Sequence, residues 1–272
     1  MEISSDKIKS YVICYSQKTY DSVVYPFAPL DHRENQRSDW QEYWPIRKFL
    51  LWSKLEEHTY YGFLSPRFTE KTGLTSEFLH RYISSISNDI DLLTFSPQPD
   101  MSSFFLNVFE QNEVFDPGFT DTTNKFLDYA GINVDVSKLI MDSTNIVFSN
   151  YFFAKPNFWR KWLILCEKIF DLCENQITLA DEIGLLKHTT YRDGVQRKVF
   201  LMERIASLIL KLNPDFKVHA YNTFHCAFSA SRLKDFSSDA VISDALKIAY
   251  NRNNHPEYIE QFSRIRDKIR KL

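Results

Sequence analysis

The sequence predicts an α/β protein with a mixed, mostly parallel sheet flanked by helices and a helical C-terminal appendage. Short apolar, β-branched or aromatic runs of strand length alternate with longer segments whose apolar residues recur at helical spacing. The chain has 272 residues, of which 44% are hydrophobic and 25% charged, a balance typical of a globular protein. Because no repeat or linker interrupts the pattern, we expect one domain. Residues 1–225 would carry the sheet and residues 226–272 the appendage.

The individual elements follow from the same patterns. Pro45 can occupy the first turn of a helix, Thr75 can cap a second helix, and Gly131 can end another. The expected strands are 10–16, 59–65, 90–95, 145–154 and 216–221. The expected helices are 45–57, 75–87, 101–112, 120–130, 157–174, 195–212, 238–250 and 256–271.

Composition excludes several classes of protein. The formal net charge of −2 argues against nucleic acid as a partner. Glycine is scarce, and neither a dinucleotide fingerprint nor a P-loop is present. The four cysteines form no CxxC pair and do not lie near histidines at zinc spacing. The N-terminus lacks a long apolar leader segment, and no apolar run approaches about 20 residues, so we expect a cytoplasmic location.

Polar side chains cluster near the ends of three predicted strands. Ligands of open α/β sheets bind beyond the carboxyl ends of the strands, so these side chains would gather at one edge if the strands are parallel. Cations suit phosphate, and amides or hydroxyls suit sugar hydroxyl groups. The alternative is that these segments are ordinary polar loops. Ser96, Gln98 and Asp100 follow the strand 90–95, and the candidate binding residues at the other two strands are Ser65, Arg67, Lys71, Asn150, Tyr151 and Lys155.

Glu203 and Arg204 are the only charges in the segment 199–210. Residues at helical offsets from Glu203 are mainly apolar, and burying an unpaired carboxylate is costly. Glu203 therefore needs either a binding partner or a functional role. It could pair with a distant cation, contact a sugar, or act as a base, since burial raises the pKa of a carboxyl group toward neutrality.

Asp89 and Asp91 form a DxD motif, and paired carboxylates of this kind can hold Mg²⁺ or Mn²⁺ against a diphosphate. This pair precedes its strand rather than following it. Asp89 could instead end the preceding helix, so a metal site here is doubtful.

Three segments in order resemble bacterial glycosyltransferase-like proteins of surface-polysaccharide clusters, including capsular and O-antigen types. YYGFLSPRF is similar to the family's YxGxxHYRR strand, SNYFFAKPNFW to its NMFI strand, and RKVFLMERIASLIL to its R…GFLAERL helix. The chain departs from the family where SPRF replaces HYRR and where no DxD follows a strand. Carried over position by position, the resemblance points to Arg67, Asn150, Glu203 and Arg204.

The resemblance implies a GT-A-like fold and an enzyme that transfers a sugar from a nucleotide-sugar donor to a saccharide or lipid-linked acceptor. Arg67 and Lys71 would neutralise the leaving diphosphate, and Asn150 and Tyr151 would orient the sugar. Glu203, held by Arg204, would contact the sugar or act as base. Two further carboxylates are reserve candidates for the base, Asp100 and Asp116. The alternatives are a non-catalytic carbohydrate-binding or assembly protein and a capsule sugar-phosphate transferase.

The expected C-terminal helix has an apolar stripe and basic final turns. Tyr258, Phe262, Ile265 and Ile269 form the stripe. Such a helix could rest on an anionic membrane as a peripheral contact, or it could pack within the molecule with its cations near the helix C-terminus.

Overall fold

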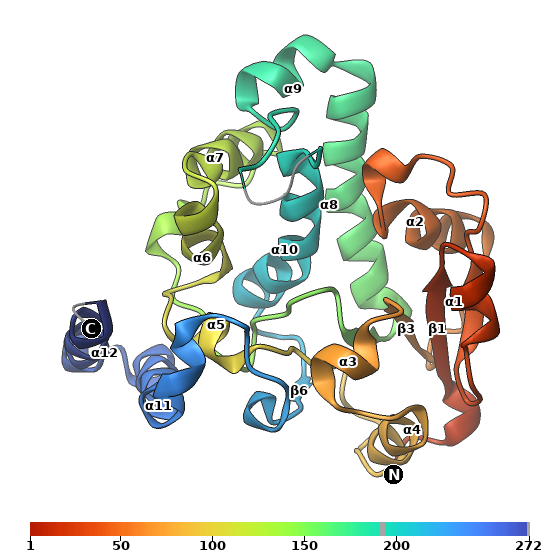
Figure 1. Cartoon of the computed structure of the whole chain (residues 1–272), viewed down its shortest axis with the longest axis horizontal. Helices are drawn as coiled ribbons and strands as arrows, with labels where there is room; N and C mark the ends of the chain where they lie inside the picture. The colour runs from red at the N-terminus through yellow and green to blue at the C-terminus, as the bar shows by residue number, and fades with distance from the viewer. Residues whose placement is uncertain (191–193, 271–272) are drawn as a thin grey trace.

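The computed structural model describes residues 1–190 and 194–270 and shows a mixed sheet with helices on both faces (Figure 1). The spatial order of the strands is β2-β1-β3-β5-β4-β6. All pairings are parallel except those of β5, which runs antiparallel to both of its neighbours, β3 and β4. The α/β class and the mostly parallel sheet are therefore confirmed. The strands are β1 (Ile8–Cys14), β2 (Ala28–Asp31), β3 (Tyr60–Leu64), β4 (Leu92–Thr94), β5 (Phe152–Ala154) and β6 (Val218–Ala220).

The strand expected over 145–154 is much shorter in the structure. Only its last three residues form β5, and the preceding residues approach the sheet as an irregular segment. Because β5 runs antiparallel, the residues before it lie at the edge where the parallel strands end. The residue after it, Lys155, lies at the opposite edge.

Alternation along the strands divides the sheet residues between two cores. Tyr61 and Phe63 of β3 belong to the larger core, whereas Tyr60 and Leu64 belong to the other. Gly62 lies between them, and a Cβ there would stand 2.5 Å from the Phe153 ring. The larger core includes residues of α2 (Tyr43–Trp52), α8 (Pro156–Asn175) and α10 (Arg197–Leu212). The smaller core includes residues of α3 (Phe68–Thr72) and α4 (Ser76–Ser84).

The remaining helices surround this centre. Helix α6 packs against α7 and α10, and α11 packs on α5 and α12 at the end of the molecule away from β1 (Figure 1). These helices are α1 (Gln17–Asp21), α5 (Pro99–Ser103), α6 (Val108–Phe115), α7 (Phe119–Tyr129), α9 (Ile177–Ile183), α11 (Ser237–Asn253) and α12 (Pro256–Arg270). Short 3-10 turns occupy Ser5–Lys7, Ser38–Trp40, Val136–Lys138, Thr223–His225 and Arg232–Phe236.

The apolar stripe of the C-terminal helix is packed inside the molecule. Phe262, Ile265 and Ile269 are buried, and Arg266 of the same helix forms an ion pair with Glu110 of α6. The stripe is therefore not presented to a membrane, and the alternative of a packed terminal helix holds. The last residue of the expected range, 271, lies outside the described residues. Within residues 1–190 and 194–270, no helix is long and apolar enough to cross a membrane.

Candidate functional site

A cleft of about 700 Å³ opens at the edge where the parallel strands β3 and β4 end. Its walls come from segments that are far apart in the chain: α3, the loop before β5, α6, α10 and the segment after β6. The lining is mainly polar or charged and includes four phenylalanine side chains. The lining residues are Arg67, Glu70, Lys71, Gln98, Gln111, Asn112, Phe115, Phe148, Ser149, Phe200, Glu203, Arg204, Ala227, Phe228 and Ala230.

Two predicted cations lie in this cleft. Arg67 is 65% exposed and forms a two-pronged ion pair with Glu70, with nitrogen–oxygen distances of 2.6 and 3.0 Å. Lys71 Nζ donates to Ser149 Oγ at 2.9 Å and lies 5.7 Å from the centre of the Tyr151 ring. Both positive groups therefore stand at the cleft wall, and Ser65 and Pro66 set the turn that brings them there.

Glu203 also lines the cleft, with 37% of its side chain exposed. The apolar pattern of 199–210 predicted a buried carboxylate, so this expectation is wrong in degree. Its Oε2 lies 4.0 Å from Nη1 of Arg204. Arg204 itself is buried and donates to the Val108 carbonyl at 3.0 Å and to Asn112 Oδ1 at 2.7 Å. Arg204 is thus a structural link between α10 and α6 rather than a group available to a ligand.

Behind Glu203 lies a small enclosed cavity that contains a second carboxyl group, Glu42. Glu42 occupies the N-cap position of α2, and its side chain has no hydrogen bond or ion pair within the described part of the chain. Burial raises its pKa from 4.5 to about 8; the negative charge of Glu203 adds to this effect, and Lys71 opposes it. A neutral carboxylic acid is therefore the favoured form of Glu42 near pH 7.

Asn150 lines the same small cavity and is 4% exposed. Its Oδ1 is buried without a hydrogen-bond partner among the described residues. Asn150 and Ser149 both have positive φ angles, 52° and 57°, in the left-handed region that non-glycine residues seldom adopt. An unsatisfied buried oxygen and a strained backbone both cost folding free energy, and such costs are typical of functional sites.

The predicted binding residues Ser65 and Tyr151 lie nearby, but they serve the scaffold. The two hydroxyl groups hydrogen-bond to each other, and both side chains are buried. Tyr151 packs edge-on against Phe68 of α3, with ring centres 5.0 Å apart. These contacts fix α3 against the segment before β5, so Ser65 and Tyr151 position the cleft wall and do not face a ligand.

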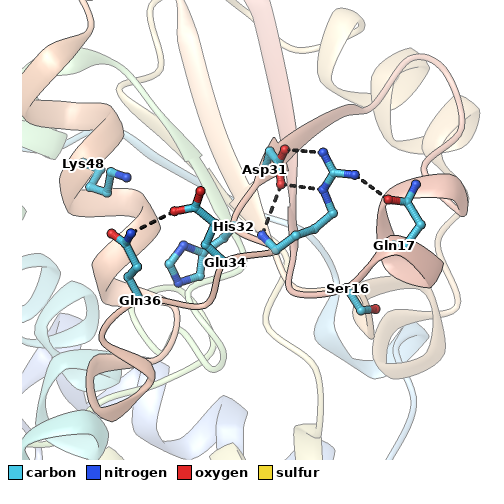
Figure 2. A pocket seen from close by; sticks show the side chains of 8 residues that line it. Ser16, Gln17, Asp31, His32, Glu34, Gln36 and Lys48 are labelled. Atoms are coloured by element: carbon cyan, nitrogen blue, oxygen red, sulfur yellow. Dashed lines mark hydrogen bonds and ion pairs between the residues drawn. The ribbon is translucent and has the colours of Figure 1, made fainter.

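A second, polar pocket of about 660 Å³ lies at the same edge of the sheet, beyond β1 and β2 (Figure 2). The Arg33 guanidinium donates to Asp31 at 2.7 and 2.9 Å and to Gln17, and it holds the pKa of Asp31 at about 2. His32 is 6% exposed, and its Nε2 has no hydrogen-bond partner within residues 1–190 and 194–270. Burial lowers the pKa of His32, and Lys48 lowers it further. The pocket thus offers a neutral imidazole beside fixed charges.

Tyr15 lies between the pocket and the small cavity. Its ring meets the His32 ring edge-on, with centres 5.8 Å apart. Burial raises its pKa, and the negative charges of Glu42 and Glu203 raise it further. The pocket, the small cavity and the cleft therefore follow one another along a single sheet edge.

The two reserve carboxylates are not part of this site. Asp100 is completely buried and accepts from the backbone N–H of Ser229 at 2.9 Å and from its hydroxyl. Asp116 is also buried and pairs with Arg197 at 2.8 and 3.1 Å. Both oxygens of each group accept hydrogen bonds that hold chain segments together, and neither carboxylate lines the cleft.

Lys155, Asp89 and Asp91 lie at the opposite edge of the sheet. Lys155 Nζ donates to the Asn88 carbonyl at 2.9 Å, because β5 runs antiparallel and carries it away from the cleft. Lys217 bonds both aspartates: its Nζ pairs with Asp89 at 3.2 Å, and its backbone N–H donates to Asp91 at 3.0 Å. Among the described residues, no group of three or more metal-ligating side chains exists. The DxD pair therefore does not fit a metal site.

The sequence analysis missed Glu42, Tyr15 and His32. Glu42 precedes a helix, whereas the search followed the ends of strands. A signal was nevertheless present, because Glu42 is a carboxylate within the aromatic run WQEYW, as Glu203 is within an apolar helix.

Comparison with known proteins assigns no family to the chain. No protein-family model, curated protein or solved structure matches it.

Proposed function

We propose that this protein is a glycosyltransferase that moves a sugar from a nucleotide-sugar donor to a saccharide or lipid-linked acceptor in bacterial surface-polysaccharide synthesis. The proposal includes a GT-A-like fold, which agrees with a mostly parallel sheet containing one antiparallel strand. The observation that carries it is the meeting of Arg67, Lys71 and Glu203 around one cleft. These three residues come from segments that are far apart in the sequence, and the family resemblance concerned only the order of the segments.

The chemistry of the cleft suits sugar transfer. A nucleotide diphosphate leaves as an anion, and cations aimed at that developing charge accelerate the step. Arg67 and Lys71 supply such cations at one wall, and Glu203 supplies a carboxylate at another. Phe148, Phe200 and other aromatic side chains offer flat apolar surfaces on which sugar rings pack. The proposed transfer assigns the diphosphate charge to Arg67 and Lys71.

The polar pocket of Figure 2 would hold the nucleoside end of the donor. Glu34, Gln36 and Lys48 line this pocket and offer acceptors and donors for the base or the ribose. In this arrangement the donor lies along the sheet edge, with its sugar directed toward Glu203.

The test begins with binding. Thermal denaturation is recorded with UDP-glucose, UDP-N-acetylgalactosamine, GDP-mannose and dTDP-rhamnose, each with and without Mn²⁺. A bound donor at about 100 times its Kd stabilises the folded state by about 2.7 kcal/mol, which appears as a raised Tm. The donor that raises Tm is then incubated with the protein alone, and free nucleotide is measured. Slow release supports a transferase, whereas binding without release supports a non-catalytic carbohydrate-binding protein.

A sugar-phosphate transferase would release a nucleoside monophosphate instead of a diphosphate, so the identity of the released nucleotide separates the two enzymes. If no nucleotide sugar in a broad panel raises Tm, the proposed function is wrong.

A further inference from the structure

Two carboxyl groups from different elements face one small cavity. Glu42 belongs to the start of α2 and Glu203 to the middle of α10, and both line the cavity together with Asn150. Glu203 also lines the open cleft, so it stands between Glu42 and any molecule bound there. Negative charges on two carboxyl groups that line one cavity repel each other, and such a pair relieves the repulsion by keeping a proton.

We propose that Glu42 and Glu203 hold one proton between them and act as a single acid–base unit, in which Glu203 faces the substrate and Glu42 is the positioning residue behind it. The inference rests on the proposed transfer reaction and adds a residue to it. A protonated Glu42 is a hydrogen-bond donor, and the buried Oδ1 of Asn150, which has no partner in the described part of the chain, is an acceptor in the same cavity. The proton on Glu42 therefore also provides a hydrogen-bond donor for the Oδ1 of Asn150.

The charges around the unit favour one proton. Lys71 stabilises negative charge on Glu42, and Nη1 of Arg204 lies 4.0 Å from Oε2 of Glu203. Burial raises the pKa of Tyr15 and of Tyr151, and the negative charge of Glu42 raises each further, so both hydroxyl groups are neutral. A cation therefore stands beside Glu203, whereas Glu42 has no ion pair in the described part of the chain, so the proton stays with Glu42.

In the transfer step two bonds break and two bonds form. The acceptor O–H bond breaks and its proton goes to Glu203, while the acceptor oxygen bonds to the anomeric carbon of the sugar. The bond from that carbon to the diphosphate oxygen breaks, and its electron pair leaves with the diphosphate. The unit now holds two protons, and it returns one to water after the products depart.

The experiment measures the proton directly. Infrared spectra of the wild type, Glu42→Gln and Glu203→Gln are recorded across the range from about pH 5 to about pH 10. We expect a carboxylic-acid carbonyl band in the wild type that disappears near pH 8 and is absent from Glu42→Gln. In Glu203→Gln the band should disappear at a lower pH, because one source of repulsion is gone. A wild type without this band at about pH 6, or a band unmoved in Glu203→Gln, would overturn the shared proton.

The catalytic link is tested by donor turnover with the nucleotide sugar identified by thermal denaturation. Wild-type turnover should fall as pH rises through about 8, and Glu42→Gln should lose this alkaline limb while binding the donor unchanged. The matched control is Asp244→Asn, which removes another buried carboxyl group whose pKa burial raises and which lies outside both cavities. It should leave the pH profile of turnover intact. An alkaline limb that persists in Glu42→Gln refutes the link. If no nucleotide sugar binds, the proposed function fails, and the infrared titration still decides whether the proton is shared.

Discussion

Replacing Glu42 with glutamine should change the dependence of folding stability on pH. The pKa of Glu42 is about 8 in the folded protein against an ordinary value of 4.5, because burial and the charge of Glu203 disfavour the carboxylate. Above 4.5 the unfolded chain loses this proton, whereas the folded chain keeps it until about pH 8. The folded state therefore binds more protons in this window, and its stability falls as pH rises.

The size of the effect follows from the width of the window. A separation of about 3.5 pH units, at about 1.4 kcal/mol for each, is worth about 5 kcal/mol. Glutamine does not titrate, so the free energy of unfolding of Glu42→Gln relative to the wild type should rise by about this amount between pH 4.5 and pH 8. Below 4.5 and above 8 the difference should level off.

Urea denaturation at intervals of one pH unit measures the difference, since urea reports unfolding free energy at each pH. The same series on Glu203→Gln is the control for the pair. In Glu203→Gln the pH range in which only the folded protein keeps the Glu42 proton should end at a lower pH. Burial still raises the pKa of Glu42, but the neighbouring charge is gone. A Glu42→Gln difference that stays within about 1 kcal/mol across the whole range would refute the buried acid.

Three further predictions concern the cleft and its supports. Arg67→Ala should lower donor turnover about 100-fold with little loss of stability. Arg160→Ala, which removes another exposed two-pronged pair, with Glu57, should leave turnover unchanged. Equal turnover in the two variants would rule out the phosphate role. Arg204→Met should cost about 3 kcal/mol in urea denaturation, because buried acceptors on α6 lose their charged donor. Gly62→Ala should cost about 1–3 kcal/mol, since its Cβ would stand 2.5 Å from the Phe153 ring, and an unchanged Tm would contradict this packing.

One rule was enough to predict where two of the cleft residues lie. Arg67 and Lys71 follow a parallel strand, and the carboxyl ends of parallel strands share an edge, so their place could be inferred before the sheet order was known. Glu203 could be found because a charge inside an apolar helix requires a special environment. These inferences depended on local pattern alone.

The errors have equally local causes. Lys155 was misplaced because a strand of three residues does not reveal its direction, and β5 proved antiparallel. Asp100 and Asp116 were chosen as carboxylates near strand or helix ends, but sequence does not show that Ser229 and Arg197 already occupy their oxygens. Partners more than 80 residues away in the chain decide what each carboxylate can do.

The backbone around the cavities adds what side-chain patterns could not predict. Gln41, Gln98, Ser149 and Asn150 all have positive φ angles without being glycine, and each lines the cleft or the cavity behind it. Each such residue costs about 1–2 kcal/mol relative to ordinary backbone, so the surrounding packing must hold it in place. That packing is visible beside Asn150, where Tyr151 is fully buried against Phe68. Uncharged polar residues of the cleft and the cavity are therefore carried on strained backbone that the surrounding packing holds in place, which is a property expected of a preorganised binding site and not of ordinary polar loops.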